Sequence, residues 1–461
     1  MTEEEARSCF EAYFLGYGNQ PSGPGPAISL PFAATRSRSP LLLAVITAIG
    51  ARSRSRYDTF QAALSAALLE VPAPGRDVLG GELELKALVL LGVYTGNPKV
   101  LHQAAMMCYN CDLPNALLKL GQLSQQDKAS VAGQRLVVQG RTFLTCWTAL
   151  HFYTTAQSEF PQHNGFNVSA DVIHYQLDIL EQSEFRLLPA DRMLRVNIEE
   201  CLILKEVFDH IGPSLRIEPV KCAFVLETVD SAITRLREWS RKWADAMSLV
   251  TTWGDADNVK AAIPLHHAVL NVMYYLFGRG SSWDRMERNP RNRELARLGR
   301  EAALAMLRWG VESRIWLPHS MIAIYHTFIN IPTALTVLFN VSRLFPADSP
   351  LKTVRTLLHR VLEQSNAAIA AGVAPPHELA RARDTKLQVL EFDRWAFELG
   401  EEEGGAEVAA EVANRGEEGG SAVKPEAAED ESLGEDMSAN LGALKLDLAL
   451  WGSMLVEAPE V

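Results

Sequence analysis

The stretch SPLLLAVITAIGAR, from Ser39 to Arg52, predicts a capped and buried helix. The hydroxyl of Ser39 can accept a hydrogen bond from a free backbone N–H of the first turn. Pro40 suits the next position, because its missing N–H would have no helical partner there. The residues from Leu41 to Ile49 are apolar or small on nearly every side, so we expect other helices to cover both sides of this one.

Helical spacing of apolar residues recurs along the chain, and we find no convincing alternating strand and no internal repeat. The sequence therefore predicts an all-α fold with a single large helical domain over residues 1–398, a disordered acidic linker over 399–440 and a short amphipathic segment over 441–461. Beyond the first stretch, helices are expected at residues 1–20, 57–69, 82–94, 99–120, 141–158, 187–210, 220–251, 261–277, 301–309, 321–345, 350–371 and 378–398.

Net charge separates the chain into a nearly neutral body and an acidic tail. Residues 1–399 hold 40 acidic and 41 basic side chains, a net charge of +1, whereas residues 400–461 hold 16 acidic and 3 basic ones, a net charge of −13. The body therefore gives no sign of a strongly basic nucleic-acid surface. The cluster Arg52, Arg54 and Arg56 is too short to change this, and a solvated helix end explains it better.

Three short motifs follow one another along the chain: the Ser39-Pro40 helix that ends at Arg52, an aromatic helix with Arg141, Phe143 and Trp147, and the spacing of Trp239 and Trp243 after Leu236. Together they resemble the fungal-specific transcription factor domain, which is the middle homology region of zinc-cluster regulators. The family places Gly-Arg-Pro after an aromatic helix, and here Glu159-Phe160-Pro161 stands instead, so the proline alone is retained. We treat the matching residues as structural; they are Ser39, Pro40 and Arg52 in the first helix, Arg141, Phe143 and Trp147 in the aromatic helix with Pro161 after it, and Trp239 and Trp243 in a Leu-x-x-Trp-x-x-x-Trp spacing.

The resemblance implies a regulator of transcription in a fungal nucleus, with a helical body that senses an effector or inhibits activity. The zinc-cluster DNA-binding module of the family needs six closely spaced cysteines, and this chain does not contain it. We therefore expect DNA contact either through a segment missing from this chain or through a DNA-bound partner, and homo- or heterodimerisation stays open.

Cysteine and histidine pairs were weighed as metal sites. The six cysteines are sparse and indicate reduced thiols in an intracellular protein, and the acidic start of the chain lacks a signal-peptide pattern. Cys108 and Cys111 would need a second close pair to form a zinc site, so two core thiols on one helix are favoured.

The histidine pairs, His266 with His267 and His319 with His326, lack an HExxH motif and a carboxylate at a helpful spacing, so core histidines are favoured. We expect no metal and no cofactor.

Enzyme and membrane interpretations find little support. The chain has no GxSxG, GxxxxGK[ST] or GxGxxG motif, and its nearest Asp-rich run, Asp255 to Asp257, is expected in a loop. We expect no enzyme, although a helical small-molecule binder or an enzyme without a recognisable motif is the alternative. The uncharged stretch from Ile315 to Ser342 is long enough to span a bilayer, but Pro332 is expected to split it into two buried helices. We expect no membrane partner.

The tail consists of an acidic run followed by a stripe of apolar residues. From Gly400 to Asp436 it has 13 acidic and two basic residues and no aromatic one, a composition that cannot bury enough surface to fold. A stripe at steps of four, three and four residues follows it, as expected of an activation segment that binds a transcriptional coactivator or, alternatively, of a helix that docks on its own body. The stripe consists of Leu444, Leu448, Trp451 and Leu455.

Overall fold

The structure is a computed structural model in which every described regular element is a helix, so the predicted all-α class is confirmed. The described residues all belong to one unit, Met1–Phe397. The predicted linker 399–440 and segment 441–461 lie outside the described residues, which are 1–14, 30–53, 63, 67, 81–95, 98–156, 168–182, 189–217, 223–250, 263–277, 290–312, 323–370, 386 and 388–396.

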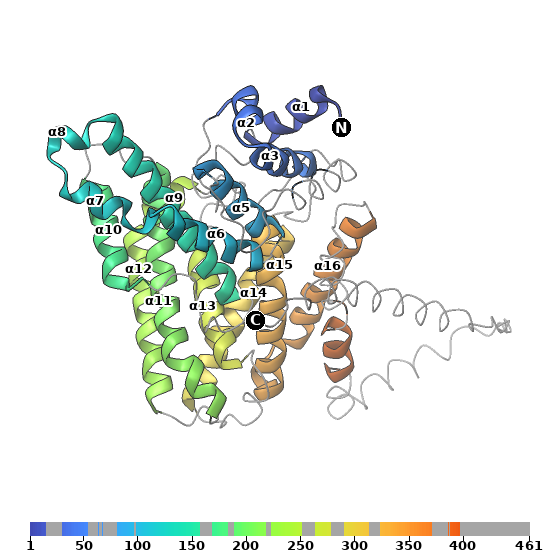
Figure 1. Ribbon diagram of the computed structural model, residues 1–461. Coiled ribbons are helices and arrows are strands. Elements are labelled where there is room, and N and C mark those ends of the chain that lie inside the picture. The colour runs from blue at the N-terminus through green and yellow to red at the C-terminus, as the bar shows by residue number, and fades with distance from the viewer. Residues whose placement is uncertain are drawn as a thin grey trace, which may run out of the picture. The chain divides into compact units, whose positions relative to one another are not determined.

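The helices differ greatly in length, and the long ones from α11 to α15 lie side by side (Figure 1). The first part of the unit contains α1 (Glu3–Tyr13), α2 (Phe32–Arg38), α3 (Pro40–Ser53), α5 (Glu82–Thr95), α6 (Pro98–Asn110), η2 (Leu113–Asn115), α7 (Ala116–Gln122), α8 (Gln125–Lys128), α9 (Val131–Ala156) and α10 (Ala170–Gln182). The second part contains α11 (Pro189–Ile217), α12 (Ala223–Val250), α13 (Ile263–Phe277), α14 (Pro290–Glu312), α15 (Ala323–Leu344), η5 (Pro346–Asp348) and α16 (Leu351–Ala370), and residues 388–396 are also helical.

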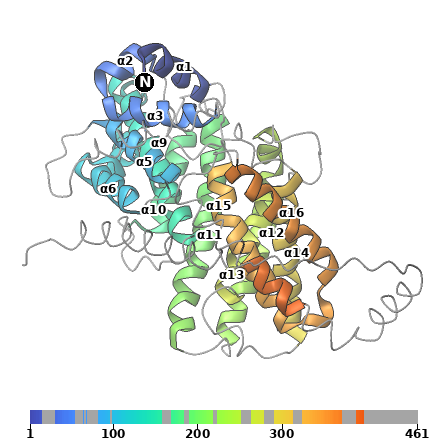
Figure 2. The same ribbon diagram turned by 90° about the vertical axis from the view of Figure 1, so that its right-hand side faces the viewer.

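Buried apolar side chains form two cores that meet at α11. The first core is built from α1 to α10 and includes Ile198 and Leu202 of α11. The second is built from α12 to α16 and the 388–396 helix, and it includes Val207 and Ile211 of α11. At 100° per residue these two sets lie on opposite faces of α11. Helix α11 therefore packs against both halves of the unit, and Figure 2 shows it between them.

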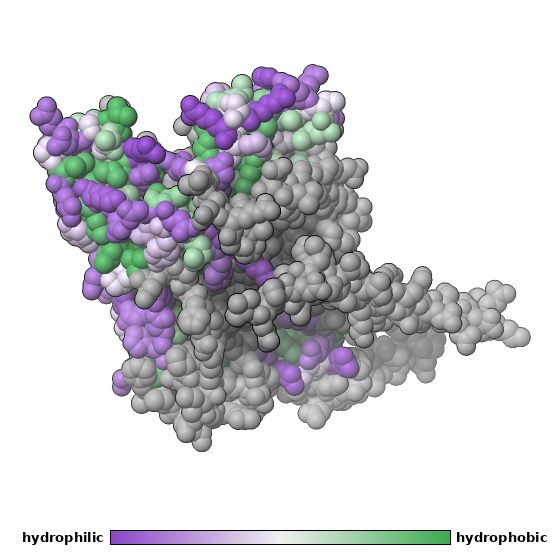
Figure 3. Space-filling view, viewed as in Figure 1, coloured by the Kyte–Doolittle hydropathy of each residue, from purple (hydrophilic) through white to green (hydrophobic). Residues whose placement is uncertain are grey.

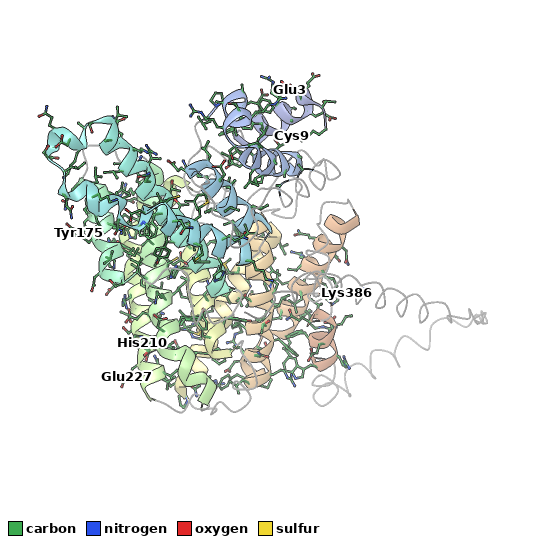
Figure 4. All side chains as sticks on the ribbon, in the orientation of Figure 1. Glu3, Cys9, Tyr175, His210, Glu227 and Lys386 are labelled. Carbon is green, nitrogen blue, oxygen red and sulfur yellow. The ribbon has the colours of Figure 1, made fainter. Side chains whose placement is uncertain are left out.

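The stretch from Ser39 to Arg52 forms the cap and nearly all of α3, as predicted. Ser39 caps this helix, because its Oγ accepts a hydrogen bond from the backbone N–H of Leu42 at 3.2 Å. Side chains from Leu41 to Ile49 are buried or half-buried, and α1, α2 and α5 pack around them. Helix α1 approaches most closely at Gly50, where a Cβ atom would lie 1.7 Å from the backbone oxygen of Cys9 (Figure 4 labels Cys9 on α1).

Two expectations about helix continuity are wrong. Residues 99–120 do not form one helix, because α6 ends at Asn110 and Asp112 takes a left-handed conformation with φ 54° before η2 and α7. Pro114 follows that turn and favours a new start. Conversely, Pro332 lies inside the continuous helix α15. Packing of α15 against α13 and α14 outweighs the one backbone hydrogen bond that the proline cannot donate.

Within the described ranges, we find no helix with the length and apolar character needed to cross a membrane. The stretch from Ile315 to Ser342 falls partly outside these ranges, since residues 313–322 are not described.

Replacing Gly50 by alanine should destabilise the protein strongly. The added methyl group would meet backbone atoms of Cys9 and Tyr13 rather than a flexible side chain, so α1 and α3 must move apart. Overpacking of this kind costs about 2 kcal/mol or more. Chemical denaturation followed by circular dichroism would measure the loss. Gly81→Ala is the matched control, because its methyl group meets nothing closer than a Glu84 side-chain oxygen at 3.4 Å. An equal effect of the two changes would contradict the tight contact.

Candidate functional site

The described family-motif residues lie at helix interfaces and do not converge on one cavity. Phe143 and Trp147 are fully buried in the first core, whereas Trp239 and Trp243 are buried in the second. The backbone of Arg52 belongs to α3, but its side chain is outside the described residues, as are the whole of Pro161 and the run Asp255 to Asp257. Phe143, Trp147, Trp239 and Trp243 therefore make packing contacts in the two cores.

Arg141 joins α9 to the start of α11. Its guanidinium donates two parallel hydrogen bonds to Asp191, with Nε–Oδ1 at 2.7 Å and Nη2–Oδ2 at 2.6 Å. The Asp191 side chain is 2% exposed and the Arg141 side chain 23%. The carboxylate also lies in the first turn of α11, where the helix dipole favours a negative charge. This bidentate pair fixes how the two longest helices near the first core meet.

One turn beyond Phe143, Trp147 and His151 stack at 3.8 Å between ring centroids. The His151 Nδ1 lies 2.8 Å from the backbone oxygen of Trp147, to which it donates. Burial lowers the pKa of His151 to about 4, against the opposing effect of that hydrogen bond, and the charge of Lys205 lowers it further. His151 is therefore neutral near neutral pH and serves as a core side chain.

Trp239 and Trp243 fasten α12 to α11 through their indole N–H groups. Trp239 Nε1 donates to the backbone oxygen of Val196 at 3.0 Å, and Trp243 Nε1 donates to Glu199 Oε2 at 2.7 Å. Lys242 binds the same carboxylate, with Nζ 2.9 Å from Oε1. The spacing of the two tryptophans thus places two polar anchors on one face of α12.

Glu199 belongs to a charged network that connects α10, α11 and α12. Arg195 lies 3.1 Å from Glu199 and 3.3 Å from Asp178 of α10. Burial raises the pKa of Glu199, but hydrogen bonds from Trp243, Lys242 and Arg195 outweigh it, so that pKa is lowered overall. This network was not predicted from the sequence, although Arg195 and Glu199 stand at the i, i+4 spacing of a helical ion pair.

A second polar group is buried between α11 and α13. His267 Nδ1 lies 3.0 Å from Glu200 Oε1, and Asn271 Nδ2 lies 3.1 Å from His267 Nε2. With its proton on Nδ1, the imidazole donates to the carboxylate and accepts from the amide. We predicted a core histidine with no carboxylate at a helpful spacing, and the carboxylate comes instead from another helix. His266 is half-buried, and burial lowers its pKa.

This polar group is not arranged for proton transfer to a substrate. All three residues are at most 7% exposed, and both ring nitrogens of His267 already have partners. In the part of the chain that the structure describes, no three His, Cys, Asp or Glu side chains are grouped so as to hold a metal ion. His319 lies outside that part, and so does the side chain of His326.

The prediction of two core thiols on one helix is correct for Cys108 and wrong for Cys111. Cys108 is buried in α6, but Cys111 follows the end of that helix and is partly exposed. Cys108 instead meets Cys146 of α9, whose thiol hydrogen bond raises the pKa of Cys108 well above its usual range, with burial adding to the effect. A thiol that resists ionisation is a poor nucleophile and a poor metal ligand.

Two surface pockets border α14. One, of about 600 Å³, is lined by Arg293, Arg297, Arg300 and Asp348 among others. The other, of about 350 Å³, lies between α14 and α16. Elsewhere, hydrophobic side chains reach the surface among hydrophilic ones over α7 to α10 (Figure 3), and Tyr175 of α10 is one of them. Exposed apolar side chains are common on proteins and assign no function by themselves.

Comparison with known proteins gives no assignment: no family model, no curated protein and no solved structure matches this chain.

Removing the guanidinium of Arg141 should destabilise the protein, because it leaves the buried carboxylate of Asp191 without its bidentate donor. We expect Arg141→Met to cost about 3 kcal/mol of unfolding free energy. Replacing both partners, as Arg141→Met with Asp191→Leu, should restore part of the loss. The matched control is Arg135→Met at an exposed arginine of the same helix, which should change stability by at most about 0.5 kcal/mol. Denaturant titration measures all three variants.

The buried His151 should make stability depend on pH. Its pKa is lowered in the folded protein, so between pH 6.5 and about 4 the unfolded chain binds a proton that the folded chain does not. Stability is therefore lost as the pH falls through this window. From pH 7 to pH 5 the loss from this group is about 2 kcal/mol, and His151→Gln should remove it. His210→Gln, at an exposed histidine of α11, is the control (Figure 4). Equal pH dependence in wild type and His151→Gln would contradict the assignment.

Proposed function

We propose that this chain is a transcription regulator of the fungal-specific type, with a helical regulatory body and a C-terminal activating tail. It would act in the nucleus and contact DNA through a partner or a further zinc-cluster segment. The observation that carries the proposal is the order of charge and apolar residues in the tail: 13 acidic residues between Gly400 and Asp436 precede the stripe Leu444, Leu448, Trp451 and Leu455. Acidic segments that end in an apolar helical stripe are typical of activation regions that fold on a groove of a coactivator.

The body supports the proposal through its motif residues. Ser39, Arg141, Trp239 and Trp243 each make a specific contact at a helix end or a helix interface. Contacts of this kind are what we expect of a regulatory body whose motif residues hold its helices in a defined arrangement. The polar clusters described above are saturated by their own protein partners, which favours a regulatory body over an enzyme.

Physical chemistry sets how strongly the tail would bind. Burying one aromatic and three leucine side chains in a groove contributes roughly 1.5–3 kcal/mol for each fully desolvated side chain. Ordering the segment on binding offsets part of this gain, so we expect a modest affinity. Self-repulsion of the acidic run keeps the stripe in solvent and available to a partner.

A fusion experiment tests the proposal. Residues 400–461 are joined to a heterologous DNA-binding domain, and a reporter gene is measured in a fungal host. We expect activation by the wild-type tail and loss of most of it in the triple variant Leu448→Ala, Trp451→Ala and Leu455→Ala. Changing several glutamates to glutamine should only reduce it.

Two leucines off the stripe provide the matched control. Leu446 and Leu450 lie about 200° and 240° from Leu444 on a helical projection, so replacing both with alanine should leave most of the activity. A fusion that is well expressed and nuclear but inert would refute the proposal, as would equal losses in the stripe and control variants.

Small-molecule binding is a second candidate function. The pocket between α14 and α16 is the observation that favours it. Three basic side chains and one acidic side chain line this pocket, so its lining carries a net positive charge.

A further inference from the structure

The pocket between α14 and α16 has a cationic rim. Its volume is about 350 Å³, within the range of small-molecule sites. Arg308 and Glu312 of α14 line one side, and Lys352 and Arg360 of α16 line the other. Helices α14 and α16 pack directly against each other, as Figure 2 also shows. Three positive charges and one negative charge thus border the pocket.

Within the described residues, the three cations lack the ion pairs that most other basic residues of α14 and α16 form. Arg291 pairs with Asp230, Arg293 with Asp348, and Arg355 with Asp393. Within the described ranges, Arg308, Lys352 and Arg360 form no ion pair, and all three side chains are exposed. Glu312 is the one carboxylate among the described residues that line this pocket.

Charge is concentrated on these two helices. Together α14 and α16 carry eight arginine or lysine residues and four glutamates, a net charge of +4, whereas residues 1–399 as a whole carry +1. A concave surface with an excess of positive charge focuses the electric field and raises the local concentration of anions.

The floor of the pocket is apolar and held in place. Leu357 is 7% exposed and Val311 is half-buried. The backbone oxygen of Val311 accepts a hydrogen bond from Gln364 Nε2 at 3.0 Å, which ties the end of α14 to α16. A ligand with an apolar group could therefore rest on a floor that does not need to rearrange.

We infer that this pocket binds a small organic anion, in which a carboxylate, phosphate or sulfate is attached to a short alkyl or aryl group. The anionic group meets Arg308, Lys352 and Arg360, and the apolar group covers Val311 and Leu357. Both parts are needed, because each exposed ion pair contributes little by itself in water. An inorganic anion would lack the contact with the floor, and a neutral analogue would lack the contact with the rim.

The neighbouring pocket at the start of α14 does not fit this chemistry. Its Arg293 pairs with Asp348, and its Arg297 pairs with Glu294 and Glu301. Its arginines are thus largely neutralised by the protein, and Arg300 donates to Ser349 Oγ at 3.4 Å. This pocket supplies the control residue for the experiment, since Arg297 and Arg308 stand on the same helix.

Isothermal titration of the full-length protein with phenyl phosphate tests the inference, with inorganic phosphate and benzyl alcohol as the two partial ligands. We expect phenyl phosphate to bind more tightly than either one, and its affinity to fall as sodium chloride is added. The triple variant Arg308→Gln, Lys352→Gln and Arg360→Gln should bind phenyl phosphate at least tenfold more weakly. Arg297→Gln should change the affinity less than twofold, because Arg297 lies about 16 Å along the helix from Arg308.

The outcomes are separable. The three residues are exposed, so the variants should keep the wild-type circular dichroism spectrum, and the single change Arg308→Glu serves if the triple variant does not fold. Failure of phenyl phosphate to bind at millimolar concentration would overturn the inference. Equal losses in Arg297→Gln and the triple variant would also overturn it, as would equal affinity for benzyl alcohol. The inference rests on the small-molecule candidate named above and does not depend on activation by the tail, so the pocket and the tail can each fail alone.

Discussion

Helix α11 has to satisfy two cores at once, and the other helices of the unit are arranged around that requirement. Ile198 and Leu202 face the first core, while Val207 and Ile211 face the second. On a helix with two buried faces, a carboxylate that is taken out of water beside either core needs a partner. Asp191, Glu199 and Glu200 find such partners in α9, α12 and α13, respectively. Each of these polar contacts therefore joins α11 to a different neighbouring helix.

These polar contacts fix the register of α9 and α13 on α11 more than they add to the free energy of unfolding. Taking a carboxylate such as Glu200 or Asp191 out of water costs several kcal/mol, and its partners return a comparable amount only when their geometry is right. Asp191 receives a bidentate contact from Arg141, and Glu200 accepts from His267, whose other ring nitrogen accepts from Asn271; these contacts supply that geometry. A sliding of α9 or α13 along α11 by one turn would separate the partners and leave the desolvation cost unpaid. Apolar contacts alone discriminate less sharply between such registers.

Local sequence signals predicted much of the fold. The cap at Ser39 and the burial after it depend on residues within a few positions, and the helices that begin near Glu82 and Leu351 follow from the spacing of apolar side chains. The four-residue step between Trp239 and Trp243 puts both on one face of α12, where both are buried. Such features are visible in one sequence because a helix repeats its geometry every few residues.

Features that depend on distant partners could not be predicted in this way. Glu200 and His267 are 67 residues apart, and Arg141 and Asp191 are 50 apart, so no local pattern links them. The continuity of α15 through Pro332 also reflects its neighbours rather than its own sequence. The cationic pocket could not be predicted from the sequence for a different reason. Arginines on a helix are normally read as a solvated face, and the absence of acidic partners becomes visible only after α14 and α16 are packed together.

The close approach of α1 to α3 has a consequence for how this protein can diverge. At position 50 the neighbouring atoms belong to the backbone of α1, which no change of side chain can remove. A relative with the same packing must therefore keep glycine there, whereas Ala48, Ile49 and Ala51 meet an apolar core that accepts other side chains of similar volume. In related chains, glycine at the position equivalent to Gly50 would thus indicate that α1 is packed as it is here. Another residue at that position would indicate that the first helix has moved or is absent.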